Sequence, residues 1–233
     1  RRMWLDKVVT QLEPVYFELL SRFSKLLKQR SHFWRSNISK NDQHNSLIDS
    51  FDAQIAQVGT RILRRRIRAL EKLKPHIQSW HNYLSKSKEK INLDYNSSIK
   101  IINNDDEAEI TNTLTKELLN QRSLEELTGR CTIGPHRDDI EFSINDISVR
   151  KFGSAGQQRT ITLALKMAEL ELVRNTIHMD PILILDDVLA ELDIVRQSLL
   201  LDSVGNQTQC FISATHLNKF NNEFLESSQV IYL

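Results

Sequence analysis

The sequence has few of the features that membrane insertion, secretion or disulfide frameworks require. It holds no run near the roughly 18 uninterrupted apolar residues of a membrane span. No apolar segment with a cleavage site follows the N-terminus, so no signal peptide is evident. The two cysteines, Cys131 and Cys210, lie far apart, which favours free thiols over a bridge. These absences predict no membrane partner and a reducing, cytoplasmic location.

Glycine is also scarce, and one glycine-dependent motif is missing. None of the six glycines is followed by lysine, whereas a phosphate-binding loop (Walker A) requires the pattern G-x-x-x-x-G-K-[ST]. We therefore expect no ATP hydrolysis by this chain alone. Because the chain begins with Arg1 rather than Met, we interpret residue 1 as the edge of a fragment.

The small net charge of +1 hides an asymmetry along the chain. Residues 1–90 carry 19 Lys and Arg against 8 Asp and Glu, and residues 91–233 carry 12 against 22. This division predicts two domains, 1–90 and 91–233, with different partners. A basic module favours nucleic acid, and a solvated helical face is the alternative.

Apolar spacing of three and four predicts long helices in residues 1–90. One stripe covers 5–27 and a second covers 48–73, with a polar loop between them. Pro14 either kinks the first helix or begins a second one, and Pro75 is expected to end the long helix before a short third one. The pattern favours an antiparallel helical hairpin, the arm, with a plain helical bundle as the alternative.

Residues 91–233 alternate between strand and helix patterns. Strands are expected at 92–96, 182–185, 209–213 and 230–233, with a hairpin formed by 140–144 and 147–151. Helices are expected at 105–120, 157–173 and 193–201. This order predicts an α/β lobe with a mostly parallel sheet. The apolar run 182–185 fits a strand buried on both faces.

Two segments of this lobe carry candidate chemistry. The apolar run ends in Asp186-Asp187, and adjacent carboxylates at the carboxyl end of a strand fit Mg²⁺ bound with nucleotide phosphates. A solvated turn is the alternative. The second segment, 152–159 (FGSAGQQR), opens a helix whose unpaired amides favour phosphate. An ordinary serine-capped helix is the alternative there.

The order of these segments resembles the second half of an ABC-type ATPase. Gly153 to Gln157 is similar to the signature motif, 182–187 to Walker B, and 190–193 (AELD) to the D-loop, while His216 follows the next strand as a switch histidine would.

Further motifs are similar to the RecF family of DNA-repair ATPases. They are 134–139 (GPHRDD) with the hairpin after it, 157–160 (QQRT), 163–166 (LALK), 185–189 (LDDVL), and toward the N-terminus Tyr16 with 26–30 (LLKQR). The resemblance implies an ABC-type head with a short helical arm. It also implies ATP with Mg²⁺, an ATP-dependent homodimer, binding to DNA that is single-stranded or forms a junction of single and double strands, and RecO and RecR as partners. The implied roles are recombinational repair, maintenance of replication forks and SOS induction.

The resemblance also implies residue roles. Asp186 holds Mg²⁺, Asp187 positions or activates the attacking water, and Asp193 communicates across the dimer. The γ-phosphate held by a second subunit is bound by the segment Ser154, Ala155, Gly156 and Gln157.

Three departures from the ABC pattern bear on these roles. Ala155 stands where the signature has glycine, so its amide reaches phosphate past a methyl group. Asp187 stands where most ABC ATPases carry Glu, so slow hydrolysis by the full-length protein is expected. His216 lies slightly beyond the place that a short strand would give it.

Two remaining groups complete the prediction. The cluster Arg61, Arg64, Arg65 and Arg68 has no interleaved aromatic residues, so we expect it to contact DNA backbone phosphates without reading sequence. His136 has no neighbouring nucleophile, and a structural or nucleotide-proximal role is expected. The alternative function is a DNA- or protein-binding scaffold with a vestigial ATPase half.

Overall fold

The computed structural model describes residues 1–35, 42–186, 196–200, 209–217, 220 and 222–232. These residues form two compact units. The first unit combines Arg1–Lys74 with Leu93–Phe142, and the second combines Pro75–Asn92 with Ser143–Leu233. The chain crosses between the units within helix α3 (Asp42–Ser85) and strands β1 (Ile91–Asn96) and β2 (Asp139–Ile144). The division into domains at residue 90 stays a prediction.

The first unit begins with two helices separated by Pro14. Helix α1 (Arg2–Leu12) ends before the proline and α2 (Val15–Arg35) begins after it. The amides of Tyr16 and Phe17 bond to the carbonyls of Glu13 and Pro14, so the new helix starts on the proline. Of the two roles predicted for Pro14, the start of a second helix is confirmed.

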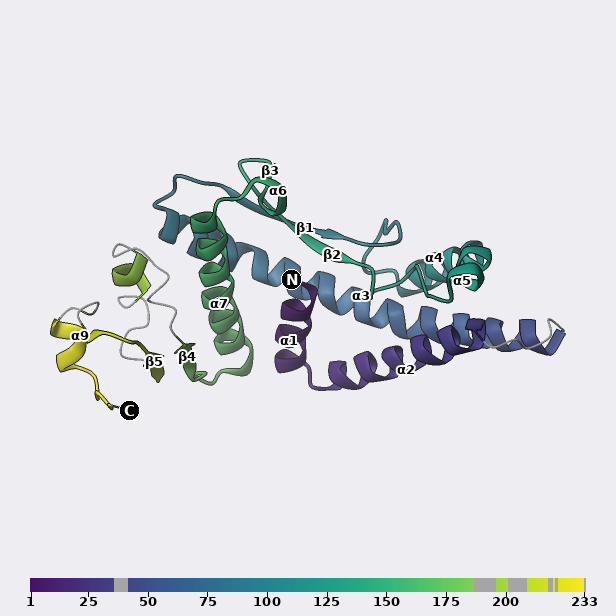
Figure 1. The fold of residues 1–233 in the computed structure, drawn as a ribbon, viewed down its shortest axis with the longest axis horizontal. Helices are drawn as coiled ribbons and strands as arrows, with labels where there is room; N and C mark the ends of the chain where they lie inside the picture. The colour runs from purple at the N-terminus through teal and green to yellow at the C-terminus, as the bar shows by residue number, and fades with distance from the viewer. Residues whose placement is uncertain (36–41, 187–195, 201–208, 218–219, 221, 233) are drawn as a thin grey trace. The chain divides into compact units, whose positions relative to one another are not determined.

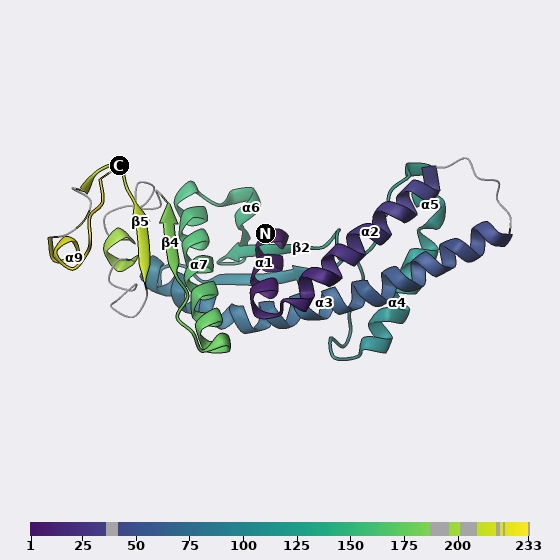
Figure 2. The ribbon, with the colours of Figure 1, turned by 90° about the horizontal axis from the view of Figure 1, so that it is seen from below.

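Helix α2 and the N-terminal part of α3 form the expected antiparallel hairpin. The two helices lie side by side in both views (Figures 1 and 2). Each buries the stripe that the sequence predicts, which includes Tyr16, Phe23 and Leu26 on α2 and Ile55 and Ile62 on α3. Burying such side chains stabilises by about 1.5–3 kcal/mol each relative to exposure.

The prediction that Pro75 ends the helix is wrong, because α3 continues through it to Ser85. An interior proline removes one backbone hydrogen bond and crowds the preceding turn. Leu73 and Ile77, on either side of it, are both fully buried. Packing therefore holds the helix together across the proline, and the short third helix expected after it is the end of α3.

Two shorter helices complete the first unit. Helix α4 (Glu107–Asn120) starts at Asp106, whose side chain accepts a hydrogen bond from the amide of Glu109, and it buries the predicted apolar stripe. Helix α5 (Arg122–Thr128) ends at Gly129, whose φ of +62° is a left-handed conformation that glycine adopts without strain.

The strands β1, β2 and β3 (Ile147–Ser148) form one sheet in that order. Between β2 and β3, Asn145 and Asp146 both have positive φ, as a two-residue hairpin turn requires. The hairpin is confirmed, but its second strand stops at Ser148. The rest of the predicted strand is helix α6 (Val149–Phe152), in which the amide of Gly153 closes a turn on the carbonyl of Val149.

The second unit is built on α7 (Ala155–Ile177) and two parallel strands, β4 (Leu183–Asp186) and β5 (Cys210–Ser213). Leu163 and Met167 of α7 pack with Leu183 and Leu185 of β4. The helix-rich α/β architecture confirms the expected ABC-type lobe with its helical arm.

Two strand predictions in this unit need correction. Ile184 is 72% exposed, so β4 is buried on one face rather than two. Within the described residues, α7 covers only the face that carries Leu183 and Leu185. Residues 230–232 form no strand, and the last regular element is helix α9 (Asn222–Glu226). Among the helices that the structure describes, none is both long and apolar enough to cross a membrane.

Candidate functional site

The signature-like segment starts helix α7. Ser154 is the N-cap residue, and its hydroxyl accepts a hydrogen bond from the amide of Gln157 at 3.2 Å. The Gln157 side chain accepts in return from the amide of Ser154 at 2.9 Å. This reciprocal capping box fixes the first turn of the helix. Both the ligand-binding and the helix-cap interpretations of the segment are compatible with it.

The turn before α7 depends on Gly153. A side-chain carbon added there would lie 2.6 Å from both the carbonyl oxygen and a methyl carbon of Val149. Only glycine lets α6 approach so closely, and the chain then turns directly into α7. Ser154, Ala155 and Gly156 are all exposed. The N-terminal end of this helix, which favours anions, therefore faces the surface.

The carboxylate of Glu89 contacts both the first turn of α7 and a buried histidine. The side-chain amide of Gln157 donates to a carboxylate oxygen of Glu89 at 2.8 Å. The other oxygen of Glu89 lies 3.7 Å from Nε2 of His81, which is fully buried. Burial lowers the pKa of His81, and the Glu89 carboxylate opposes this shift. The signature-like turn is thus attached to the segment that follows α3.

The candidate metal ligand Asp186 ends β4, as the sequence predicts. Its carboxylate accepts a hydrogen bond of 2.6 Å from the hydroxyl of Ser213, which occupies the paired position at the end of β5. His216 follows three residues later and is exposed. The predicted residues Asp187 and Asp193 lie outside the described residues. The structure therefore brings Asp186 and Ser213 together.

The residues at this strand end fit one part of a magnesium site. A carboxylate oxygen such as that of Asp186 is a ligand that Mg²⁺ prefers when it is bound with phosphates. No cluster of three or more His, Cys, Asp or Glu able to hold a metal occurs in the part of the chain that the structure describes. Asp186 could therefore supply one ligand, and the others would come from nucleotide, water or residues elsewhere.

The predicted DNA-binding arginines lie in the first unit and are mostly engaged. Arg61 and Arg64 both pair with Glu107, and Arg64 also donates to backbone carbonyls of residues 104 and 105. Arg65 donates to Glu13 at 2.9 Å. Arg68 is exposed. The α3 cluster is thus already partly neutralised by carboxylates of its own unit.

Residues of the 134–139 motif make several hydrogen bonds within the first unit. Nε2 of His136 lies 3.1 Å from the carbonyl of Cys131, and the guanidinium of Arg137 donates to the same carbonyl. Asp138 accepts from the hydroxyl of Tyr95 and the amide of Ser98, each at 2.7 Å. Burial lowers the pKa of His136. These contacts support the structural role expected for His136.

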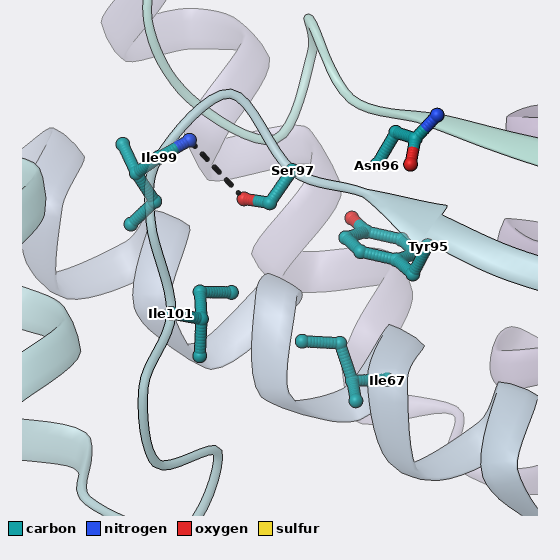
Figure 3. Close-up of a pocket in the computed structure, with 6 residues that line it drawn as sticks. All are labelled: Ile67, Tyr95, Asn96, Ser97, Ile99 and Ile101. Carbon is teal, nitrogen blue, oxygen red and sulfur yellow. Dashed lines mark hydrogen bonds between the residues drawn. The ribbon is translucent and has the colours of Figure 1, made fainter.

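A separate hollow of about 420 Å³ in the first unit is lined by Ile67, Tyr95, Asn96, Ser97, Ile99 and Ile101 (Figure 3). Its wall is divided almost evenly between polar and apolar surface, and the hydroxyl of Ser97 accepts a hydrogen bond from the amide of Ile99. None of the predicted site residues lines this hollow.

Two site contacts were missed in the sequence. Ser213 could have been found, because it ends the strand that follows Asp186, and parallel strand ends meet at one sheet edge. Glu89 has no such signal, since it lies in a lysine-rich stretch, 68 residues before its partner Gln157.

Comparisons with known proteins agree with the resemblance. No family model matches the chain. The DNA replication and repair protein RecF of Parasynechococcus marenigrum (strain WH8102) is 47% identical over 232 residues, which are 99% of this chain and 64% of that protein. RecF of Nostoc punctiforme is 42% identical over 236 residues, 63% of its length.

Solved structures give the same result. The recombination mediator protein RecF of the RecFOR pathway, solved as RecF-ATPrS, matches with a TM-score of 0.84 and 29% identity. The match covers 94% of this chain and 58% of that one, and the RecF-ATP structure matches nearly as well. Over nearly its whole length this chain is therefore similar to RecF proteins, and it spans a little less than two thirds of the length of these curated relatives.

Proposed function

We propose that this chain is the signature and Walker B part of a RecF-type, ATP-dependent DNA-binding protein. The observation that carries the proposal is the exposed start of α7, where a capped serine and two small residues leave helix amides open to an anion. The RecF structures with the same fold are described as complexes with ATP or ATPrS. The remaining part of the nucleotide site would come from a phosphate loop outside this sequence.

In this proposal each residue acts on one side of a shared nucleotide. Ser154, with the amides of Ala155 and Gly156, binds the γ-phosphate held by a second subunit, and Gln157 keeps the turn closed. Asp186 holds Mg²⁺ for its own subunit's nucleotide, oriented by Ser213. When bound, Mg²⁺ neutralises charge on the phosphates.

Residues next to Asp186 would govern hydrolysis and communication. Asp187 positions the attacking water, and its short side chain makes turnover slow. His216 senses the γ-phosphate, and Asp193 signals across the dimer interface.

The biological role follows from the family. We propose that the protein acts in recombinational repair, maintenance of replication forks and SOS induction, with RecO and RecR as partners. The basic helices α2 and α3 would contact DNA phosphates. Arg68 is exposed for this purpose, and Arg61, Arg64 and Arg65 would exchange carboxylates for phosphates.

Two substitutions at Ser154 test the nucleotide role in the longer protein that carries the phosphate loop. Asp and Asn both cap helices well and are nearly equal in size, so Ser154→Asp and Ser154→Asn should leave α7 intact. Only aspartate places a negative charge where the γ-phosphate docks. We expect the Asn variant to dimerise with ATP and the Asp variant to fail, while both still bind ATP as monomers.

Sedimentation with and without ATP, together with nucleotide binding, separates these outcomes. If Ser154→Asp dimerises as readily as Ser154→Asn, the segment is only a helix cap. The scaffold with a vestigial ATPase half would then be the better function.

A further inference from the structure

Helix α2 carries a row of cations on one face. Arg22, Lys25, Lys28 and His32 are spaced by three, three and four residues, which places them on one side of the helix. All four are exposed. The buried side chains of α2 occupy the opposite side, namely Tyr16, Phe23, Leu26 and Arg30. We call Arg22, Lys25, Lys28 and His32 the α2 basic face.

This face differs from the α3 arginines in its partners. Within the described residues, Arg22, Lys25 and Lys28 make no ion pair and no side-chain hydrogen bond. Helix α2 contains a single acid, Glu18, at its start. Arg61 and Arg64 of α3 instead pair with Glu107 of α4, a helix that lies along a different side of α3 from α2 in both views (Figures 1 and 2).

The chemistry of the face narrows the kind of partner. Arginine and lysine side chains offer only hydrogen-bond donors, which match phosphate oxygens. Ser21 and Gln29, which lie among the cations, are also polar and exposed. An interfacial membrane helix needs an apolar side turned toward the lipid, and the apolar side of α2 is buried in its own unit.

We propose that the α2 basic face is the principal phosphate-binding surface of this chain, and that it binds the backbone of double-stranded DNA. The inference rests on the DNA binding proposed above and names its surface. From Arg22 to His32 the face extends about 15 Å along the helix, at about 1.5 Å per residue. A duplex presents one negative charge per about 1.7 Å of its axis, so several phosphates lie within reach without any base contact.

The test uses the longer protein that carries the phosphate loop and measures, with ATP present, its binding to a fluorescent duplex of mixed sequence at several salt concentrations. The variant Arg22→Gln/Lys25→Gln/Lys28→Gln removes three cations, and glutamine preserves helix propensity. We expect the slope of log K against log salt to shrink by about 2 to 3 units. The control variant Lys7→Gln/Lys100→Gln/Lys116→Gln carries the same charge change at exposed positions outside α2 and α3, and it should change the slope by less than about one unit.

The possible failures are distinct. If the unmodified longer protein binds no duplex with ATP at any salt concentration, the proposed DNA binding fails, and the inference fails with it. If it binds duplex and the α2 variant keeps the full salt slope, only the inference is overturned. A last measurement uses vesicles with 30% phosphatidylserine. If the α2 variant loses binding to these vesicles but keeps its binding to DNA, the face binds lipid and DNA is rejected as its ligand.

Discussion

Arg30 is a fully buried cation in the hairpin of the first unit. Its Nε donates to Asp52 at 2.7 Å, and its NH1 group contacts Glu125 and the sulfur of Cys131. Arg122 donates to the second oxygen of Asp52 at 2.5 Å. Burial raises the pKa of the Cys131 thiol to about 11, with the guanidinium of Arg30 opposing the shift. The thiol is therefore neutral, and the charges of this cluster balance one another.

Replacing Arg30 by methionine should destabilise the chain strongly. Methionine keeps much of the volume, but it leaves Glu125 as a buried carboxylate without its cation and Asp52 with Arg122 alone, which costs about 3–5 kcal/mol. Urea unfolding followed by circular dichroism measures the loss. Arg22→Met on the exposed side of the same helix is the control, expected to stay within about 0.5 kcal/mol. Equal effects of the two substitutions would show that the buried cluster contributes nothing specific.

Two buried histidines predict how stability depends on pH. Burial lowers the pKa of both His81 and His136 below the ordinary value of about 6.5. The unfolded chain therefore binds protons that the folded chain excludes. The stabilisation is complete above about pH 6.5 and is lost as the pH falls through the lowered folded values.

The expected loss is up to about 1.4 kcal/mol per pH unit for each histidine as the pH falls below about 6.5. His136→Gln keeps a donor for the carbonyl of Cys131 and removes one of the two titrations. Its unfolding free energy should fall less steeply over this range, and the exposed His32→Gln provides the comparison. A slope that is unchanged in the His136 variant contradicts the assignment.

At the level of elements, α3 shows how packing overrides a helix breaker. Proline inside a helix costs about 3 kcal/mol relative to alanine, although it also restricts the unfolded chain. We expect Pro75→Ala to stabilise the chain by about 1–2 kcal/mol in urea unfolding. Pro14→Ala is the control, because Pro14 starts a helix and interrupts none, so it should be neutral or slightly destabilising. Destabilisation by Pro75→Ala would mean that the ring itself fills a needed space.

The elements with a strong apolar period could be predicted from sequence. The stripes of α2, α4 and α7 appear where the spacing of three and four places them. The errors arose where tertiary contacts determine the structure. The tendency of proline to end a helix takes no account of the burial of Leu73 and Ile77. The apolar run before Asp186 does not reveal that Ile184 is exposed.

The sequence predicted the motif residues of the candidate site, but it did not predict the residues that hydrogen-bond to them. Ser154 and Asp186 lie at the helix start and strand end that their patterns indicate. Their partners Glu89 and Ser213 come from segments distant in sequence, and only Ser213 could have been inferred, from its place at the end of the next parallel strand. The assignment of residue roles stays a prediction until the variants above are measured.

At the scale of the whole molecule, the opposite charges of the two halves of the sequence meet within the first unit. Arg30 pairs with Glu125, Arg64 with Glu107 and Arg1 with Asp139, each joining a basic N-terminal residue to an acid beyond residue 90. Folding therefore neutralises much of the asymmetry that the sequence shows. The α2 basic face is the part of helix α2 that this neutralisation leaves untouched.

The discontinuity of the first unit has a consequence during protein synthesis. Its opening segment ends at Lys74, but the segment that completes it ends at Phe142, 68 residues later. At about 5–20 residues per second, a ribosome needs roughly 3–14 s to make that stretch. During this interval the nascent helices carry Arg30 without Glu125 and Arg66 without the carbonyl of Pro135. The unfinished chain is then at its most cationic, beside the polyanionic RNA of the ribosome itself.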